Sequence, residues 1–257
     1  MTTIDLNCDM GESFGRYTLG MDEAAMAHIT SANIACGFHA SDPDVMDRTV
    51  KLAVENKVGV GAHPGFPDLM GFGRRKMDCS PEEITNLMIY QIGALSAFCK
   101  VNGTRLRHVK PHGALYMAAV EDPEVARAVA RAILAVDPDL LYVALAGIKG
   151  ETMTAMGNEM GLKVVYEAFP DRAYTPEGNL VSRKLPGAVI KDPDQVAKRA
   201  LLMAKEGRVV AVDGTSIELD AQTLCVHGDN PAAVDLVKNI RKVFAQNQVD
   251  VAPMGGV

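Results

Sequence analysis

Residues 106–136 read LRHVKPHGALYMAAVEDPEVARAVARAILAV, and this stretch contains the pattern that decides the fold. The run from Leu106 to Lys110 is short and apolar, which predicts a strand. Asp122 followed by Pro123 predicts the start of a helix, because Asp can cap the free N–H groups and proline fits the first turn. Apolar residues then recur at helical spacing, at Val125, Val129, Ile133 and Val136. The stretch therefore predicts a strand, a polar turn and an amphipathic helix.

The same alternation repeats along the whole chain. A capping residue precedes proline at four further places, Asp42-Pro43, Ser80-Pro81, Asp192-Pro193 and Asn230-Pro231. Strand-like runs lie between the predicted helices, at residues 4–8, 32–36, 58–62, 140–145, 163–168, 209–212 and 224–226. Seven or eight such repeats without a linker predict parallel strands joined by right-handed crossovers. We therefore expect one α/β domain over residues 1–257, a (β/α) barrel, with a doubly wound open sheet as the alternative.

Composition and charge exclude several classes of protein. The chain has 257 residues, of which 48% are apolar and 23% charged, and this is enough for a large core. A net charge of −6 provides no basic field, so nucleic acid is not an expected partner. Because the first ten residues lack a signal-like pattern and no run of about 18 apolar residues occurs, we expect neither secretion nor a membrane span. Five scattered cysteines favour a reducing cytoplasm and buried packing over a nucleophilic role.

Polar residues gather where the predicted strands end. Ligands of parallel barrels bind there, because the loops and the helix N-termini converge on the same space. The strand-end residues that we predict to be catalytic are Asp9, His39, His63, Lys110 and His112. Each histidine taken alone is more often structural, but their shared position favours a site. Candidates for binding the substrate are Glu12, Arg74, Arg75, Glu167, Arg172, His227 and Asp229.

Two predicted loops are too long to be simple connections. Residues 64–79 contain several glycines and two arginines, and residues 169–186 contain a turn-forming sequence. Each loop either covers a site or forms a surface or oligomer contact. His108 shares its side-chain direction with Lys110 and His112, and it receives no role from the sequence.

The residue types leave the chemistry open between two mechanisms. Histidines with a carboxylate either hold a divalent metal, for which Asp9, His39 and His63 are the candidates, or act as general acid and base. Lys110 could stabilise an oxyanion or bind a substrate carboxylate, and its structural alternative is an ion pair with Glu167 or Asp9. The sequence contains no phosphate-binding loop, no serine-hydrolase elbow and no dinucleotide fingerprint.

Five long segments, in the expected order, resemble the LamB/YcsF family, which is that of the A subunit of prokaryotic 5-oxoprolinase. They are Asp5–Glu12, Ala32–His39, Gly61–Phe66, Val109–Tyr116 and Val226–Pro231. The Gly71–Arg75 loop and the Glu167–Arg172 segment fit the same pattern, so the resemblance runs from end to end. It implies a seven-stranded, TIM-like barrel related to the glycoside hydrolase and deacetylase group.

The resemblance also implies a function and partners. The implied reaction is the ATP-dependent opening of the 5-oxoproline lactam to glutamate, with two further 5-oxoprolinase subunits, B and C, as partners. In this scheme Asp9 or one of His39, His63 and His112 acts as base, Lys110 stabilises the oxyanion, and the candidate arginines hold a carboxylate or phosphate. Two alternatives stay open, a metal-dependent amide or N-acetyl hydrolase acting alone, and a non-catalytic subunit that binds oxoproline. The resident metal, the subunit that binds ATP and a homo-oligomer also stay open.

Overall fold

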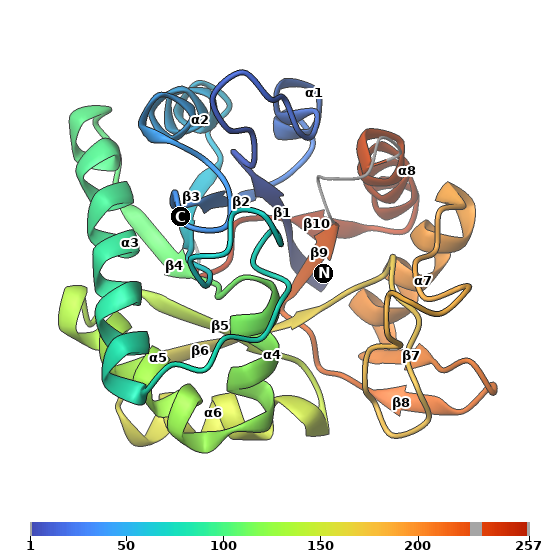
Figure 1. The fold of residues 1–257 in the computed structure, drawn as a ribbon. Helices are drawn as coiled ribbons and strands as arrows, with labels where there is room; N and C mark the ends of the chain where they lie inside the picture. Colours follow the sequence, from blue (N-terminus) through green and yellow to red (C-terminus); the bar gives the residue numbers. More distant parts are fainter. Residues whose placement is uncertain (1, 227–232, 256–257) are drawn as a thin grey trace.

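The computed structural model describes residues 2–226 and 233–255, and its centre is a closed barrel of seven parallel strands (Figure 1). The barrel order is β1 (Thr2–Met10), β2 (Ser31–Ala35), β3 (Gly59–His63), β4 (Leu106–Val109), β5 (Leu141–Leu145), β6 (Lys163–Ala168) and β9 (Thr223–Val226). Strand β9 pairs in parallel with both β6 and β1, which closes the barrel. The predicted barrel is confirmed, and the open-sheet alternative is wrong.

Helices surround the barrel, and four of them begin at the capping residue and proline pairs that the sequence predicts. They are α1 (Asp22–Met26), α2 (Pro43–Glu55), α3 (Pro81–Val101), α4 (Gly113–Glu121), α5 (Pro123–Val136), α6 (Glu151–Glu159), α7 (Pro193–Glu206) and α8 (Ala233–Gln246), with a short 3₁₀ turn at Ile148–Gly150. The side chains of Asp42, Ser80, Asp122 and Asp192 accept hydrogen bonds from the first turns of α2, α3, α5 and α7. The pair Asn230-Pro231 lies outside the described residues.

One predicted barrel strand is wrong. The run predicted at residues 209–212 forms β7 (Arg208–Val210), which pairs antiparallel with β8 (Ser216–Glu218) as a separate two-stranded sheet. Val209 is buried, while Val210 and Val212 are exposed, so this run cannot be a strand buried on both faces. A short strand that the sequence did not predict, β10 (Val249–Val251), pairs with the start of β1.

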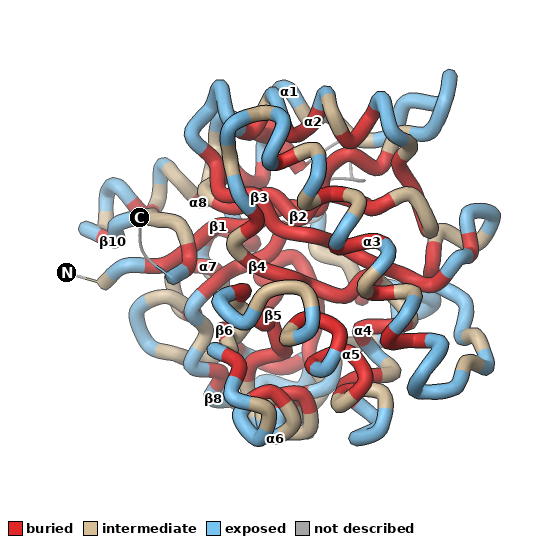
Figure 2. The backbone as a smooth tube through the Cα atoms, turned by 90° about the vertical axis from the view of Figure 1, so that its left-hand side faces the viewer, coloured by how far each residue is buried: buried red, intermediate tan, exposed pale blue. Residues whose placement is uncertain are grey.

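The strands form the core, as the buried segments at the centre of Figure 2 show. Every residue of β2 and β3 is buried, as expected for parallel strands covered by helices. Among the described helices, only α3 has the length and apolar composition of a membrane span. It packs against α5, α2, β3 and β4 through a buried stripe that includes Ile84, Met88, Ile92 and Leu95. This packing is that of a core helix in a compact barrel.

Candidate active site

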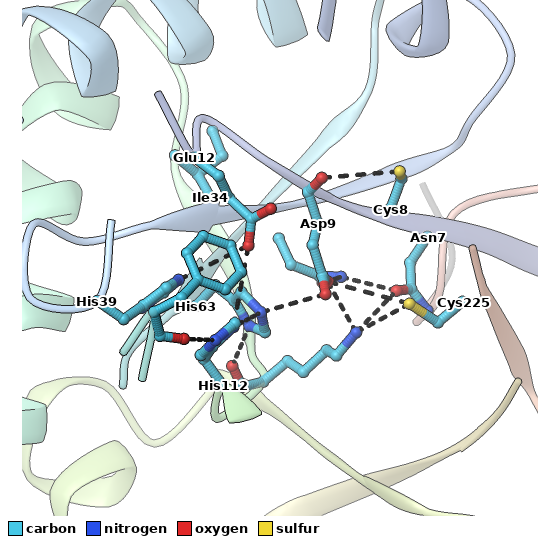
Figure 3. Close-up of polar contacts among 12 residues, drawn as sticks. Asn7, Cys8, Asp9, Glu12, Ile34, His39, His63, His112 and Cys225 are labelled. Carbon is cyan, nitrogen blue, oxygen red and sulfur yellow. Dashed lines mark hydrogen bonds and ion pairs between the residues drawn. The ribbon is translucent and has the colours of Figure 1, made fainter. Parts of the chain in front are cut away.

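The five residues predicted to be catalytic lie together at the carboxyl ends of the strands. Figure 3 shows four of them, Asp9, His39, His63 and His112. Asp9 and His63 stand at the ends of β1 and β3, His39 follows β2, and Lys110 and His112 follow β4. All five side chains are buried. Parallel pairing explains the clustering, since it brings the carboxyl ends of β1 to β4 to the same edge.

Lys110 lies between two carboxylates inside the barrel mouth. Its Nζ atom is 2.8 Å from Asp9 Oδ1 and 3.0 Å from Glu167 Oε1. The Sγ atom of Cys225 on β9 is also 3.0 Å away. Burial alone would lower the pKa of Lys110, but Asp9, Cys225 and Glu167 together hold that pKa well above its ordinary value. The ammonium group therefore stays charged at neutral pH.

Polar side chains of β2 and β4 orient the Asp9 carboxylate of β1. Strand register places Asp9 beside Asn33, Asn33 beside Gly61, and Gly61 beside His108. Asn33 Nδ2 donates to Asp9 Oδ1 at 2.8 Å, and His108 Nε2 donates to Asn33 Oδ1 at 2.7 Å. Gly61 makes room for the His108 ring, because a Cβ atom at that position would collide with it.

Three histidine rings form a compact group next to Asp9. His63 Nε2 is 3.3 Å from Asp9 Oδ2 and 3.0 Å from His112 Nδ1. The rings of His39 and His112 are stacked, with centroids 3.6 Å apart and an interplanar angle of 6°. Burial, followed by the neighbouring histidines, lowers the pKa of both His39 and His112 well below the ordinary value. These two rings are therefore neutral at pH 7.

Glu12 completes a set of possible metal ligands. Its Oε1 atom lies 3.8 Å from His39 Nε2 and 3.9 Å from His112 Nδ1. Glu12, His39, His63 and His112 each offer one ligand atom, and these atoms all lie within 4.8 Å of one another. The set shares His39 and His63 with the set expected from the sequence. It contains Glu12 and His112 in place of Asp9, whose Oδ1 atom is occupied by Lys110 and Asn33.

The loop at residues 64–79 covers the histidines, which is one of the two roles predicted for it. The backbone oxygen of Phe72 accepts a hydrogen bond from His112 Nε2 at 2.8 Å, and the Phe72 ring packs edge-on against His39 and His112. Gly73 has a φ of +61°, and a Cβ atom there would lie 2.7 Å from His39 Cβ. Glycine is therefore required for the loop to approach this closely.

The residues expected to bind the substrate lie in different surroundings. Glu167 is in the centre, while the guanidinium group of Arg74 lies 4.8 Å from the centroid of the Phe72 ring. Arg75 pairs with Asp68, and Arg172 donates to backbone oxygens within its own loop. These two groups hold loops in place. His227 and Asp229 lie outside the described residues.

Sequence reasoning missed several residues of the centre. Asn7, whose Oδ1 atom accepts a hydrogen bond from Asn33 Nδ2 at 2.7 Å, and Asn33 itself both lie within strands. The only mark of Asn7 in the sequence is its alternation with Asp5 and Asp9 along β1. Cys225, interpreted as a small buried residue, contacts the Lys110 ammonium group. Only the closure of β9 against β1 brings Cys225 to this place, and no local pattern contains that information.

A closed parallel barrel with ionisable side chains at the carboxyl ends of its strands defines a protein of the TIM-like class with an enzyme-type centre. Residues 4–257 match the LamB/YcsF family, and the chain belongs to that family. It is 57% identical over 255 residues to the A subunit of 5-oxoprolinase from Natranaerobius thermophilus, covering 99% of this chain and 98% of that protein. It is 56% identical over 251 residues to the protein of the same name from Pyrococcus abyssi, covering 98% and 97%.

One solved structure agrees with this family assignment, and a second shares only the fold. The lactam utilization protein from Thermus thermophilus has a TM-score of 0.93 and 48% identity, and the match covers 98% of this chain and 100% of that one. A structure described as T48 deacetylase with substrate matches with a TM-score of 0.52 and 12% identity, over 98% of this chain and 88% of that one. At this low identity, the second likeness shows the shared barrel fold alone.

Proposed function

We propose that the chain is the A subunit of an ATP-dependent 5-oxoprolinase, which hydrolyses the lactam of 5-oxo-L-proline to L-glutamate. The observation that carries the proposal is the end-to-end similarity, at 51–57% identity, to relatives that bear the name of the 5-oxoprolinase A subunit. The buried centre also supports the proposal, because it contains the kinds of groups that hydrolysis of an unreactive amide such as a lactam requires. Its opening needs a base for water and a positive group for the developing oxyanion.

The centre offers a residue for each of these tasks. Water would attack the lactam carbonyl carbon, and Asp9 or His63, 3.3 Å apart, would take its proton. Lys110, held charged by Asp9 and Glu167, would donate to the oxyanion. The carbon–nitrogen bond then breaks, and the ring nitrogen takes a proton and becomes the amine of glutamate. Arg74, the candidate arginine beside the histidines, would hold the substrate carboxylate.

We further infer that ATP is handled together with two partner subunits, B and C, in the cytoplasm. Transfer of the γ-phosphoryl group of ATP to the lactam oxygen would release ADP and make the carbonyl carbon more electrophilic, and Lys110 would then donate to this phosphorylated oxygen. Attack by water and cleavage of the carbon–nitrogen bond would leave an acyl phosphate, which a second water hydrolyses to glutamate and phosphate. This chain contains no phosphate-binding loop of the usual sequence, so partner chains are the expected source of part of the nucleotide site. The five free cysteines fit a reducing compartment.

The test is glutamate release from 5-oxoproline, measured with and without ATP and with and without the two partners. We expect turnover only in the complete mixture. Lys110→Ala and His63→Ala should each reduce kcat by at least about 100-fold, the usual effect of losing an oxyanion donor or a general base. Unchanged turnover in both variants would contradict the assignment. Amide hydrolysis by this chain alone, without ATP, would favour a self-sufficient metal-dependent hydrolase instead.

A further inference from the structure

The hydrogen bonds of His63 and His112 leave two ring nitrogens facing each other. His63 Nδ1 is 2.7 Å from the backbone oxygen of Lys110, and His112 Nε2 is 2.8 Å from the backbone oxygen of Phe72. A carbonyl oxygen only accepts hydrogen bonds, so both of these outer nitrogens carry hydrogen. In neutral rings the inner nitrogens, His63 Nε2 and His112 Nδ1, are then bare lone pairs only 3.0 Å apart. Such a contact is repulsive unless a positive species lies between the two atoms.

Two features indicate that this species is a metal ion. A ring N–H that donates to a backbone carbonyl is the arrangement that orients metal-binding histidines, and both rings have it. The carboxylate oxygen of Glu12 is 3.9 Å from His112 Nδ1, close to the separation of about 3.4 Å expected for tetrahedral ligands about 2.1 Å from zinc. A shared proton would account for the two nitrogens alone, whereas a metal ion also accounts for a carboxylate oxygen that lies within 4.8 Å of both.

We propose that Glu12, His63 and His112 bind a divalent transition metal ion, with zinc as the best fit to two imidazoles and one carboxylate. Three protein ligands leave one position open for water, as in catalytic zinc sites. Because Nε2 of His63 then binds the ion, Asp9 is the base in the proposed hydrolysis. His39 is excluded as the fourth ligand. Its ring is parallel to that of His112, so the lone pairs of the two rings run side by side and do not converge on one ion.

His39 takes a different role beside the ion. Both of its ring nitrogens are buried and have no hydrogen-bond partner. Buried polar atoms of this kind need a partner, and water on the open metal position would supply one. His39 is thus a positioning residue for that water. This role rests on the proposed lactam hydrolysis, whereas metal binding by Glu12, His63 and His112 does not.

The binding test uses the full-length chain without substrate or nucleotide. After treatment with a chelator, the protein is titrated with Zn²⁺ by calorimetry and with Co²⁺ by visible absorption, which reports the coordination geometry. We expect one saturable site per chain and the strong absorption of tetrahedral Co²⁺. Glu12→Gln and His112→Ala should each weaken Zn²⁺ binding by at least about 100-fold. His28→Gln, which changes a partly exposed histidine outside the cluster, should bind as the wild type does.

Circular dichroism checks that the variants fold, and Glu12→Gln, which keeps the side-chain shape, tests the site even where His112→Ala does not fold. The inference is overturned if the wild type shows no saturable Zn²⁺ binding, or if Glu12→Gln binds Zn²⁺ as tightly as the wild type. Metal binding without oxoproline turnover by the complete mixture would support the site and contradict the proposed function. Full turnover by verified metal-free enzyme would overturn the catalytic role of the ion and leave the proposed function standing.

Discussion

Lys110 shows how much depends on a single buried charge. Its ammonium group compensates two carboxylates that are themselves buried, Asp9 and Glu167. Removing one partner of a buried ion pair is costly, because the charge left behind has lost both its partner and its water. An exposed pair has no comparable effect, since water solvates the remaining charge.

We therefore expect Lys110→Met to lower the free energy of unfolding by about 3–5 kcal/mol. Adding Glu167→Gln to this variant should restore a measurable part of the loss, because one of the two uncompensated charges disappears. Urea denaturation at pH 7.5 measures both effects. The control is Lys51→Met, which removes an exposed pair with Asp47 and should change stability by less than about 1 kcal/mol. Equal costs for the two lysines would contradict the prediction.

His108, which contacts Asn33 beneath the centre, makes the stability of the protein depend on pH. Burial first, then the charge of Lys110, lowers its pKa to about 3 from an ordinary value of 6.5. Below pH 6.5 the His108 side chain binds a proton in the unfolded chain but stays neutral in the folded protein. Stability is therefore lost as the pH falls from 6.5 toward 3, by about 1.4 kcal/mol for each pH unit.

Comparison of the wild type with His108→Gln isolates this effect. Glutamine can still donate to Asn33, but it does not titrate. Between pH 7.5 and pH 5.0 the wild type should lose about 2 kcal/mol more of its unfolding free energy than the variant loses. Chemical denaturation at the two pH values gives the difference. If the unfolding free energy changes equally with pH in the wild type and in His108→Gln, then His108 is protonated in the folded protein at pH 5.0, and the prediction is wrong.

At the scale of elements, hydrogen bonds with two helices, α3 and α4, hold the loop at residues 64–79 in place. Gln91 of α3 makes two hydrogen bonds with Gly65, from Nε2 to the backbone oxygen at 2.9 Å and from the backbone N–H to Oε1 at 3.0 Å. On the other side, the backbone N–H of Ala114 in α4 donates to the backbone oxygen of Gly73 at 2.9 Å. The loop that covers the histidines is thus positioned by two helices.

Gln91→Ala should release one of these attachments. The side chain is fully buried, so its loss leaves both backbone groups of Gly65 unpaired, at a cost of about 1–3 kcal/mol each. We expect faster hydrogen exchange in peptides that span residues 64–79, with little change elsewhere in the barrel. Mass spectrometry measures this exchange. Asn86→Ala, an exposed substitution on the same helix, is the control and should leave the exchange of the loop unchanged.

At the scale of the whole molecule, local patterns predicted the elements and the position of the site. The cap and proline pairs mark helix starts, and the strand ends place Asp9, His63 and Lys110 on one rim. The displacement of β7 from the barrel was not predictable, because short apolar runs look alike whether they pair inside or outside it. The contact of Cys225 with Lys110 arises only when the barrel closes.

The closing contact between β9 and β1 contains a buried carboxylate away from the catalytic centre. Asp5 of β1 accepts hydrogen bonds from Thr223 on β9 and, at 2.7 Å each, from Thr30 and Ser31. Burial outweighs these bonds and raises the pKa of Asp5 to about 6 from 3.8. The folded protein therefore holds a proton here that the unfolded chain releases above pH 4.

The pH dependence that Asp5 gives to stability is opposite in sign to that of His108. Its contribution to stability is greatest below pH 4 and is lost as the pH rises through 6. From pH 5.0 to 7.5 the wild type should lose about 1 kcal/mol that Asp5→Asn does not lose, because asparagine stays neutral throughout. Urea denaturation at these two pH values, on the samples used for His108→Gln, tests both signs together. If Asp5→Asn follows the wild-type profile, Asp5 is already ionised in the closed barrel, and the hydrogen bonds from Thr30, Ser31 and Thr223 outweigh its burial.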